Sequence, residues 1–264
     1  MTRAKNGTDD GAPVQRVELE DGALWRVELA TPKANIIDVE KTRILTDVFQ
    51  QADQEPDLKA IIIASQGPHF SFGASVEEHL PDRVEEMLTG FHCLFYTMLD
   101  AAVPTLAAVR GQCLGGGLEL ASFCNRVFVA PDVRLGQPEI QLGVFAPVAS
   151  VMLAERVGRS RAEDICLSGR SLVAEEAWSI GLADEITDDP DDAALEYARV
   201  HLLPKSASSL RYAVRAARHG FAERVRRELP AVERLYLRDL MSTEDSVEGL
   251  SAFMGKRQPS WRNS

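Results

Sequence analysis

Two glutamates beside glycine-rich turns are the side chains in this sequence best suited to chemistry. Glu119 follows the run Gly115–Gly117, in a segment that is mostly apolar from Cys113 to Phe123. Burying a carboxylate without partners costs free energy or raises its pKa. We therefore interpret Glu119 as an acid that faces a cleft. The alternative is a solvated glutamate that only stabilises a helix start through the helix dipole.

Glu139 is the second candidate acid. It directly follows Pro138, whose ring fixes the backbone φ angle and favours a defined turn, and Gly136 and Gly143 flank it. Taken alone, Glu139 is an ordinary loop residue. Placed beside Glu119, it would complete a pair of carboxylates for general acid and base catalysis.

Glycines also mark two places where backbone N–H groups are free to bind an oxygen. The run Gly115–Gly117 separates an expected buried strand from an expected helix, so its N–H groups lie at the positive end of the helix dipole. This arrangement suits a phosphate or a carbonyl oxygen that becomes anionic, although no Gly-Lys-Ser/Thr phosphate loop is present. A turn that only packs a helix on a sheet has the same pattern. Gly73-Ala74 would supply a second donor at the end of another strand.

The elements that must position these residues alternate along the chain. Val14–Ala30 predicts a hairpin that turns at Asp21-Gly22. Buried strands are predicted over 58–65, 104–110 and 126–130, and helices over 39–53, 84–100 and 116–124. After Val148 the pattern is mostly helical, with helices over 209–219 and 221–240. We predict an α/β fold with parallel strands, divided into a disordered leader (1–12), a core (13–190) and a helical C-terminal region (191–264).

Composition narrows the class of protein. The 264 residues carry 29 Lys+Arg against 40 Asp+Glu, a formal net charge of −11, which argues against nucleic acid or an anionic membrane surface as the main partner. No apolar run approaches the roughly 20 residues that cross a bilayer. The four cysteines are scattered without metal-ligand spacing. We therefore expect a cytoplasmic protein with reduced thiols and no structural metal.

Several motifs together resemble one family, the crotonase (enoyl-CoA hydratase/isomerase) superfamily, from about Val14 onward. They are Phe70-Ser-Phe-Gly-Ala74, Val109-Arg-Gly-Gln-Cys-Leu-Gly-Gly-Gly-Leu-Glu-Leu-Ala121, Gly136-Gln-Pro-Glu-Ile140, Leu167-Ser-Gly-Arg170, Ala174–Leu182 and Glu248-Gly-Leu-Ser-Ala-Phe253. The resemblance implies a spiral of ββα repeats with a helical C-terminal trimerisation region, and a homotrimer or a dimer of trimers. It also implies an acyl-CoA thioester substrate, with coenzyme A as part of the substrate and no metal or redox cofactor.

The resemblance also assigns roles by position. Ala74 and Gly116 would supply the two N–H donors of an oxyanion hole, and Glu119 with Glu139 matches the two glutamates of the hydratases. Retention of both acids favours hydration or dehydration over isomerisation or thioester hydrolysis.

Coenzyme A contacts are a weaker part of the resemblance. Lys33 and Ala34 fall where the chain meets coenzyme A, and Phe253 with Lys256 would reach the adenine of a neighbouring subunit's coenzyme A. Either lysine is equally well explained as a solvated surface residue. Glu77 stands where many hydratases have a lysine, which puts that coenzyme A contact in doubt.

One segment departs from the usual hydratase pattern. Where hydratases commonly have Pro-Gly-Ala-Gly-Gly-Thr, this chain has Phe145-Ala-Pro-Val-Ala-Ser-Val151. With the other motifs, this segment is similar to the subgroup of hydratases that act on an alicyclic dienoyl-CoA in anaerobic benzoyl-CoA degradation. That similarity implies a 1,4-addition in which water reaches the β carbon of the ring and a proton reaches the far end of the diene. We expect Phe72 and Phe145 to shape the ring pocket, although a changed helix entry explains the segment equally well.

Two other functions stay open at this point. The first is an ordinary enoyl-CoA hydratase for short or cyclic 2-enoyl-CoA. The second is a non-catalytic subunit that binds an acyl-CoA. The two glutamates argue against the second, because a binding protein gains nothing from buried acids.

Overall fold

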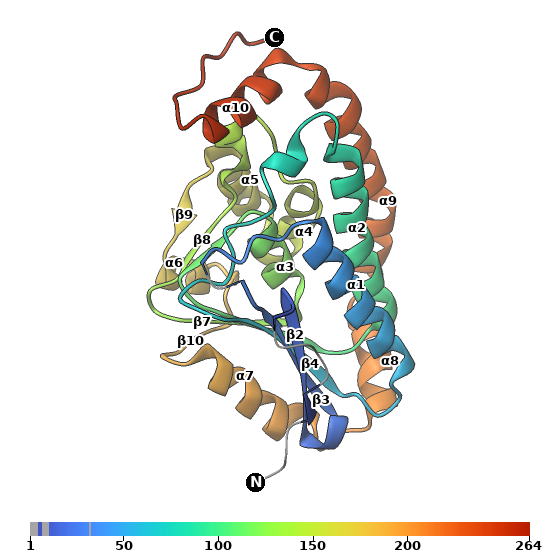
Figure 1. Ribbon diagram of the computed structural model, residues 1–264. Coiled ribbons are helices and arrows are strands. Elements are labelled where there is room, and N and C mark those ends of the chain that lie inside the picture. Colours follow the sequence, from blue (N-terminus) through green and yellow to red (C-terminus); the bar gives the residue numbers. More distant parts are fainter. Residues whose placement is uncertain (1–4, 7–10, 32) are drawn as a thin grey trace.

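The computed structural model describes residues 5–6, 11–31 and 33–264 (Figure 1). Most of the leader predicted to be disordered (1–12) lies outside these residues. Within it, β1 (Lys5–Asn6) pairs antiparallel with β2 (Val14–Leu19), which differs from the prediction of disorder for these two residues.

In the described part of the chain, the larger sheet has the strand order β1-β2-β3-β4-β5-β7-β10. The predicted hairpin is confirmed, because β2 and β3 pair antiparallel. From β3 onward the neighbouring strands are parallel, as predicted. The remaining bounds are β3 Leu24–Leu29, β4 Ala60–Ser65, β5 Thr105–Val109, β7 Arg126–Val129 and β10 Glu185–Ile186.

Strand β4 shows why its sequence is a continuous apolar run. Ile61 and Ile63 belong to the main hydrophobic core on one face of the sheet, whereas Ile62 belongs to a second core on the other face. Side chains alternate between the two faces of a strand, so a strand that is covered on both sides needs apolar residues at every position.

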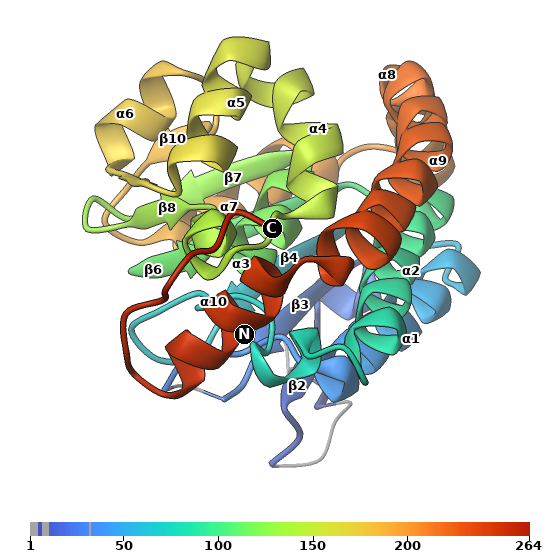
Figure 2. The ribbon, with the colours of Figure 1, turned by 90° about the horizontal axis from the view of Figure 1, so that it is seen from above.

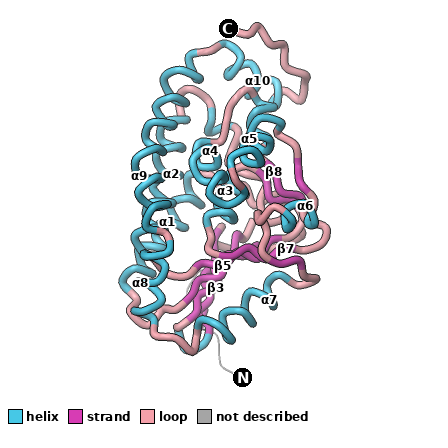
Figure 3. The backbone as a smooth tube through the Cα atoms, turned by 180° about the vertical axis from the view of Figure 1, so that it is seen from behind, coloured by secondary structure: helices cyan, strands magenta, loops and turns pink. Residues whose placement is uncertain are grey.

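Helices cover both faces of this sheet (Figures 1 and 3). Most of them lie on the face of the main core, with α1, α2, α8 and α9 side by side at one side of the molecule. The helices are α1 Val39–Gln54, α2 Val84–Ala101, α3 Gly116–Phe123, α4 Pro147–Val157, α5 Arg159–Ser168, α6 Ala174–Ser179, α7 Pro190–Tyr197, α8 Ala207–Ala217, α9 His219–Arg234 and α10 Glu244–Met254.

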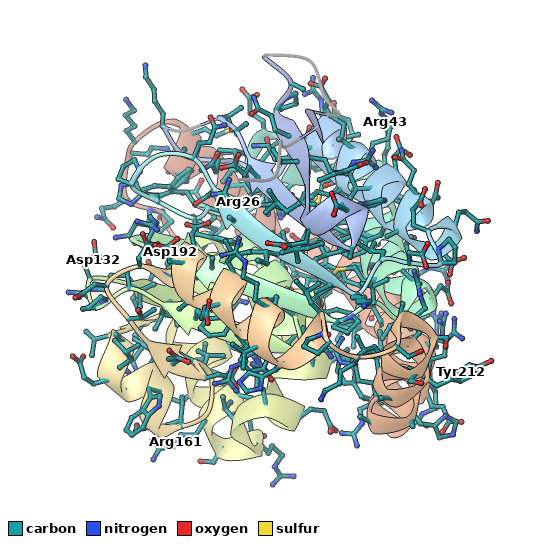
Figure 4. The ribbon with its side chains drawn as sticks, turned by 90° about the horizontal axis from the view of Figure 1, so that it is seen from below. Arg26, Arg43, Asp132, Arg161, Asp192 and Tyr212 are labelled. Atoms are coloured by element: carbon teal, nitrogen blue, oxygen red, sulfur yellow. The ribbon has the colours of Figure 1, made fainter. Side chains whose placement is uncertain are left out.

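Helix α7 covers the opposite face of the sheet. Its Ala194, and Ala198 just after it, pack in the second core with Ile62 and Phe128. Arg26 on β3 also donates to Asp191 at 2.8 Å, in the region where Figure 4 labels Arg26 and Asp192. The predicted boundary at residue 190 therefore falls inside the packed core.

The C-terminal part of the chain is helical, as predicted, with one irregularity. The helix predicted over 221–240 ends its regular part with α9 at Arg234, and a π-helical turn, Leu235–Asp239, follows. In this wider turn Tyr236 is fully buried and Leu235 is half exposed. Helix α10 then lies at the opposite end of the molecule from α7, and Figure 2 views the molecule from that end.

A smaller three-stranded sheet, which the sequence did not predict, positions the candidate acids. Its order is β6-β8-β9, with β6 (Gln112–Leu114) parallel to β8 (Arg134–Gly136) and β9 (Ser171–Leu172) antiparallel to β8. In this register Leu114 lies opposite Gly136. The two segments that carry the acids therefore leave the sheet side by side, since parallel strands end at the same edge.

Candidate active site

The backbone between the two strand ends is tightly fixed. The N–H of Gly115 donates to the carbonyl of Gly136 at 2.9 Å, and α3 begins at the next residue. After β8, the chain enters a 3₁₀ turn over Pro138–Leu142, with Glu139 in its first turn. Gly115 has a left-handed φ of +52°, and a Cβ there would lie 2.4 Å from Oε1 of Glu139. Only glycine fits this position, both for its backbone angle and for the nearby carboxylate.

Glu119 lies in the first turn of α3 and is 3% exposed. Its Oε1 accepts a hydrogen bond of 2.7 Å from the N–H of Ala149, in the first turn of α4. The positive end of a second helix thus faces this carboxylate. Burial nevertheless raises the pKa of Glu119 from 4.5 to about 7, against the opposing hydrogen bonds from the N–H groups of Ala149 and Val148.

Glu139 is partly buried beside the same site. Burial first, and then the negative charge of Glu119, raise its pKa to about 8. With its side-chain amide turned so that the nitrogen faces Glu139, the buried Gln137 donates to both carboxylate oxygens, at 3.2 and 3.0 Å.

The two glutamates behave as a coupled pair. Each has a raised pKa, and the charge of Glu119 raises that of Glu139. Two carboxyl groups that repel each other in this way hold one proton between them near neutral pH. One member is then a base and the other an acid, which is the arrangement that hydration of a double bond needs.

The two predicted oxyanion donors also meet. A Cβ built on Gly116 would lie 3.3 Å from the backbone nitrogen of Ala74. Ser71 joins the two loops, because its carbonyl accepts from the N–H of Leu114 at 2.9 Å and its hydroxyl accepts from the N–H of Gly73 at 3.0 Å. Within the described residues, no hydrogen bond from the N–H of Ala74 or of Gly116 is found. Both donors are therefore free to bind a substrate oxygen.

A cavity of about 1070 Å³ opens beside these groups. Five of the predicted site residues line it, namely Ala34, Phe72, Ala74, Glu139 and Phe253. Phe72 and Phe253 are 40% and 56% exposed, which places them at the open part of the cavity. Gly116 and Glu119 are buried and do not line the cavity themselves, although Gly116 lies against Ala74, which does.

Besides Gly116 and Glu119, three predicted site residues do not line this cavity. Lys33 and Lys256 are both exposed. Phe145 packs against Tyr236 behind the wall, with ring centroids 5.1 Å apart, so it supports the pocket rather than facing it. Phe253 reaches the cavity of its own chain.

Sequence reasoning missed three residues that the structure brings to the site and a fourth that packs behind its wall. Gln137 lies inside the motif Gly136-Gln-Pro-Glu-Ile140. Its polar side chain between Gly136 and Pro138 was the sequence feature that could have indicated its role. Ala149 acts through its backbone, which leaves no signal in its residue type. Trp261 lines the cavity although it is far in sequence from the other lining residues around Glu139. Tyr236 lies in a stretch whose pattern predicts an ordinary amphipathic helix.

Neither a metal-binding cluster nor a membrane-spanning helix is found in the described residues. Among them, no group of three His, Cys, Asp or Glu side chains is placed to hold a metal ion. None of their helices is both long and apolar enough to cross a bilayer. The expectation that the reaction needs no metal or redox cofactor stays a prediction.

Comparison with known proteins identifies the class. Residues 20–264 match the enoyl-CoA hydratase/isomerase family, and the chain belongs to this family, as its motifs indicated. A crystal structure of an enoyl-CoA hydratase from Mycobacterium avium subsp. paratuberculosis K-10 has a TM-score of 0.84 at 23% identity, covering 96% of this chain and 99% of that one. The predicted crotonase fold is thereby confirmed.

Individual relatives narrow the class further. The cyclohexa-1,5-dienecarbonyl-CoA hydratase of Thauera aromatica is 51% identical over 243 residues, which are 92% of this chain and 94% of that enzyme. The 2,3-dehydroadipyl-CoA hydratase of Escherichia coli K12 is 32% identical over 223 residues, 83% of this chain and 86% of that enzyme.

Proposed function

We propose that this protein is a hydro-lyase that adds water reversibly to cyclohexa-1,5-diene-1-carbonyl-CoA and forms 6-hydroxycyclohex-1-ene-1-carbonyl-CoA. The observation that carries this proposal is the coupled pair Glu119 and Glu139 beside two free N–H donors. The 51% identity to the hydratase from Thauera aromatica supports the choice of a ring diene. The reaction belongs to the anaerobic degradation of aromatic compounds through benzoyl-CoA.

The N–H groups of Ala74 and Gly116 polarise the substrate. Attack of water on the conjugated thioester places negative charge on the thioester oxygen, and two fixed donors stabilise that charge without reorganising. Loss of one such donor typically costs about 2.7–4 kcal/mol of barrier.

The glutamates move the protons. The ionised carboxylate takes a proton from water as the water oxygen bonds to the β carbon, and the electrons pass through the diene to the thioester oxygen. The protonated carboxyl group then gives its proton to the γ carbon at the far end of the diene, and the remaining carbon–carbon double bond forms between the α carbon and the other β carbon, in conjugation with the thioester. One proton has entered the pair and one has left it, so the pair ends with one proton as it began.

The segment after Glu139 reshapes the surroundings of the acyl pocket. Pro147, Val148 and Ala149 replace small residues of the pattern that simple hydratases commonly have here, and the N–H of Ala149 still reaches Glu119. The structure thus keeps the acid in place while bulkier residues line the base of α4. Phe145 supports this wall from behind.

We also propose that the enzyme is a cytoplasmic homotrimer or a dimer of trimers. Large apolar side chains that are half exposed or more support further contacts between copies, and they include Val200, Tyr212 and Leu235 near or on the C-terminal helices. The four cysteines are unpaired, in keeping with a reducing compartment. Lys33 and Lys256 are exposed, which leaves both side chains available to contact coenzyme A. Light scattering of the purified protein tests the assembly directly.

A turnover assay with three thioesters tests the function. Crotonyl-CoA, cyclohex-1-ene-1-carbonyl-CoA and cyclohexa-1,5-diene-1-carbonyl-CoA are compared side by side with the native chain. We expect strong preference for the diene. Preference for crotonyl-CoA would replace the proposal with a general enoyl-CoA hydratase. Tight binding without turnover of any thioester would make the chain a binding subunit.

A further inference from the structure

A second cavity, of about 350 Å³, lies between α8, α9 and the end of α2. It shares no lining residue with the cavity of the candidate active site. Helix α10, which lines that first cavity, lies toward the other end of the molecule from α8 (Figures 1 and 3). The charged and titratable residues that line the second cavity are Asp100, Arg215, Arg218, His219 and Arg226.

The charges around this cavity do not balance. Among the described lining residues, three arginines face a single carboxylate, which leaves two uncompensated positive charges on a chain whose net charge is −11. The carboxylate of Asp100 is already engaged, because it accepts from Arg226 at 2.7 Å. Neither Arg215 nor Arg218 forms an ion pair within the described part of the chain. The cavity is therefore an electropositive place on an acidic protein.

Arg218 is the most enclosed of the three arginines. Its guanidinium lies over the rings of Phe123 and Phe221, 5.4 and 5.3 Å from their centroids, and donates to the carbonyl of Phe123 at the end of α3. Burial lowers the pKa of Arg218 to about 10. A cation that is partly removed from water and has no carboxylate partner gains from an anion. A guanidinium has five N–H donors, so Arg218 keeps donors for such a ligand.

A phosphate group matches this cavity in charge and in chemistry. Near pH 7 a phosphate monoester carries a charge of about −1.5 to −2, and guanidinium groups bind its oxygens through paired N–H donors. The cavity also has an apolar wall, formed by Met98, Leu99, Val103 and Val214. Such a wall binds an organic group attached to the phosphate, whereas free phosphate leaves it uncovered.

We propose that the cavity between α8, α9 and the end of α2 is a binding site for a phosphate group carried by a small organic molecule. Arg215, Arg218 and Arg226 bind the phosphate oxygens, and the apolar wall contacts the organic part. The site is separate from the acyl-CoA cavity, so the inference does not depend on the proposed hydration.

Calorimetric titration of the full chain tests the site, with phenyl phosphate and inorganic phosphate as probes in chloride buffer of constant ionic strength. We expect phenyl phosphate to bind at one site per chain. Inorganic phosphate should bind about 3- to 10-fold more weakly, because it leaves the apolar wall uncovered. Equal affinity would support the phosphate site and assign it to free phosphate. Absence of binding by either probe at millimolar concentration would overturn the inference.

Substitutions separate this site from general surface charge. Arg215→Gln and Arg226→Gln change exposed residues and should each weaken binding of phenyl phosphate about 10-fold, since each removes a charge-assisted contact. Asp100→Asn should strengthen it, because the competing carboxylate is removed and Arg226 is released. The matched control is Arg43→Gln, which removes the same charge from an exposed position on α1, labelled in Figure 4, and should leave the affinity unchanged.

Three further results would overturn the inference. If Arg43→Gln weakens binding as much as Arg215→Gln does, the probe responds only to the net charge of the chain. If chloride at the same ionic strength raises the melting temperature as much as phenyl phosphate does, the arginines bind an adventitious ion only. If the native chain binds neither probe and the two arginine variants lower the mass measured by light scattering, the arginines pair with carboxylates of a neighbouring copy instead.

Discussion

The floor of the active site and its C-terminal flap are held by different kinds of contact. We define the floor as Gly115, Glu119, Gln137, Glu139 and Ala149. Its members are tied by backbone groups, such as Gly115 N–H to Gly136 carbonyl and Ala149 N–H to Glu119, and they lie between two helix starts and a buried sheet. Such contacts fix the carboxylates in one geometry.

The flap, residues 244–264, comprises α10 and the segment that folds back on it. Exposed acidic side chains of α10 hold this segment. Asp245 accepts from the N–H groups of Arg262 and Asn263 at 2.7 and 2.8 Å, and Glu248 accepts from Arg257 and from the N–H of Ser260. Trp261 packs over Gly143, which is outside the flap, and over Gly249 within α10. It also lines the cavity.

The two kinds of contact indicate different roles, with the floor governing the chemical step and the flap governing substrate binding. Buried backbone contacts change little with salt or with solvent, whereas exposed charged contacts are weak and easily rearranged. We therefore expect changes in the floor to act on kcat and changes in the flap to act on KM. Substitutions in each part test that division.

The largest effect is expected from the glutamates themselves. Glu119→Gln and Glu139→Gln should each lower kcat by about 10²–10⁴-fold, because each removes an acid or base from the coupled pair. The double variant should be little worse than either single variant, since the two residues act as a unit. Steady-state turnover of the diene measures this. Additive losses in the double variant would contradict a shared mechanism.

Gly115→Ala should be the next most damaging change. Its new Cβ would meet Oε1 of Glu139 at 2.4 Å and move the carboxylate, and a displacement of this size lowers kcat by about 100-fold. The control is Gly22→Ala, because Gly22 also has a positive φ, +90°, but has nothing within 4 Å of the added atom. Equal loss of activity in both variants would assign the effect to backbone strain alone.

The pH dependence of stability tests the burial of the floor. The pKa of Glu119 is raised from 4.5 to about 7 in the folded protein, so protonation stabilises the fold. This contribution is fully present below about pH 4.5 and is lost as the pH rises through 7, at about 1.4 kcal/mol per pKa unit. The melting temperature of Glu119→Gln relative to native should therefore increase between pH 5 and pH 9. Glu85→Gln, at an exposed position on α2, should show no such trend.

The smallest effect is expected in the flap. Trp261→Ala removes apolar surface from the cavity without touching the floor, so KM for the thioester should rise about 3- to 10-fold while kcat stays within about twofold. Trp178→Ala is the control, because Trp178 is 58% exposed on α6 and does not line the cavity. A large fall in kcat for Trp261→Ala would contradict the expectation that the flap acts on KM and the floor on kcat.

The sequence predicted the larger sheet and the long helices well, because their periodic patterns extend over many residues. The predicted strand over 58–65 is β4, and the predicted helix over 39–53 is α1. It did not predict the smaller sheet, because β6, β8 and β9 are only two or three residues long and carry no period. It also placed the core boundary at residue 190, since the pattern of α7 does not reveal which face of the sheet it covers.

By itself, the sequence determined which groups are available for the chemistry, namely Glu119, Glu139 and the glycine turns that leave N–H donors free. These follow from residue type and local backbone preference. Only the tertiary structure decided that Ala149 faces Glu119, that Tyr236 packs on Phe145 and that Trp261 returns to the cavity. Each of these contacts joins segments far apart in the chain, and their distances depend on how the helices pack, which no local pattern encodes.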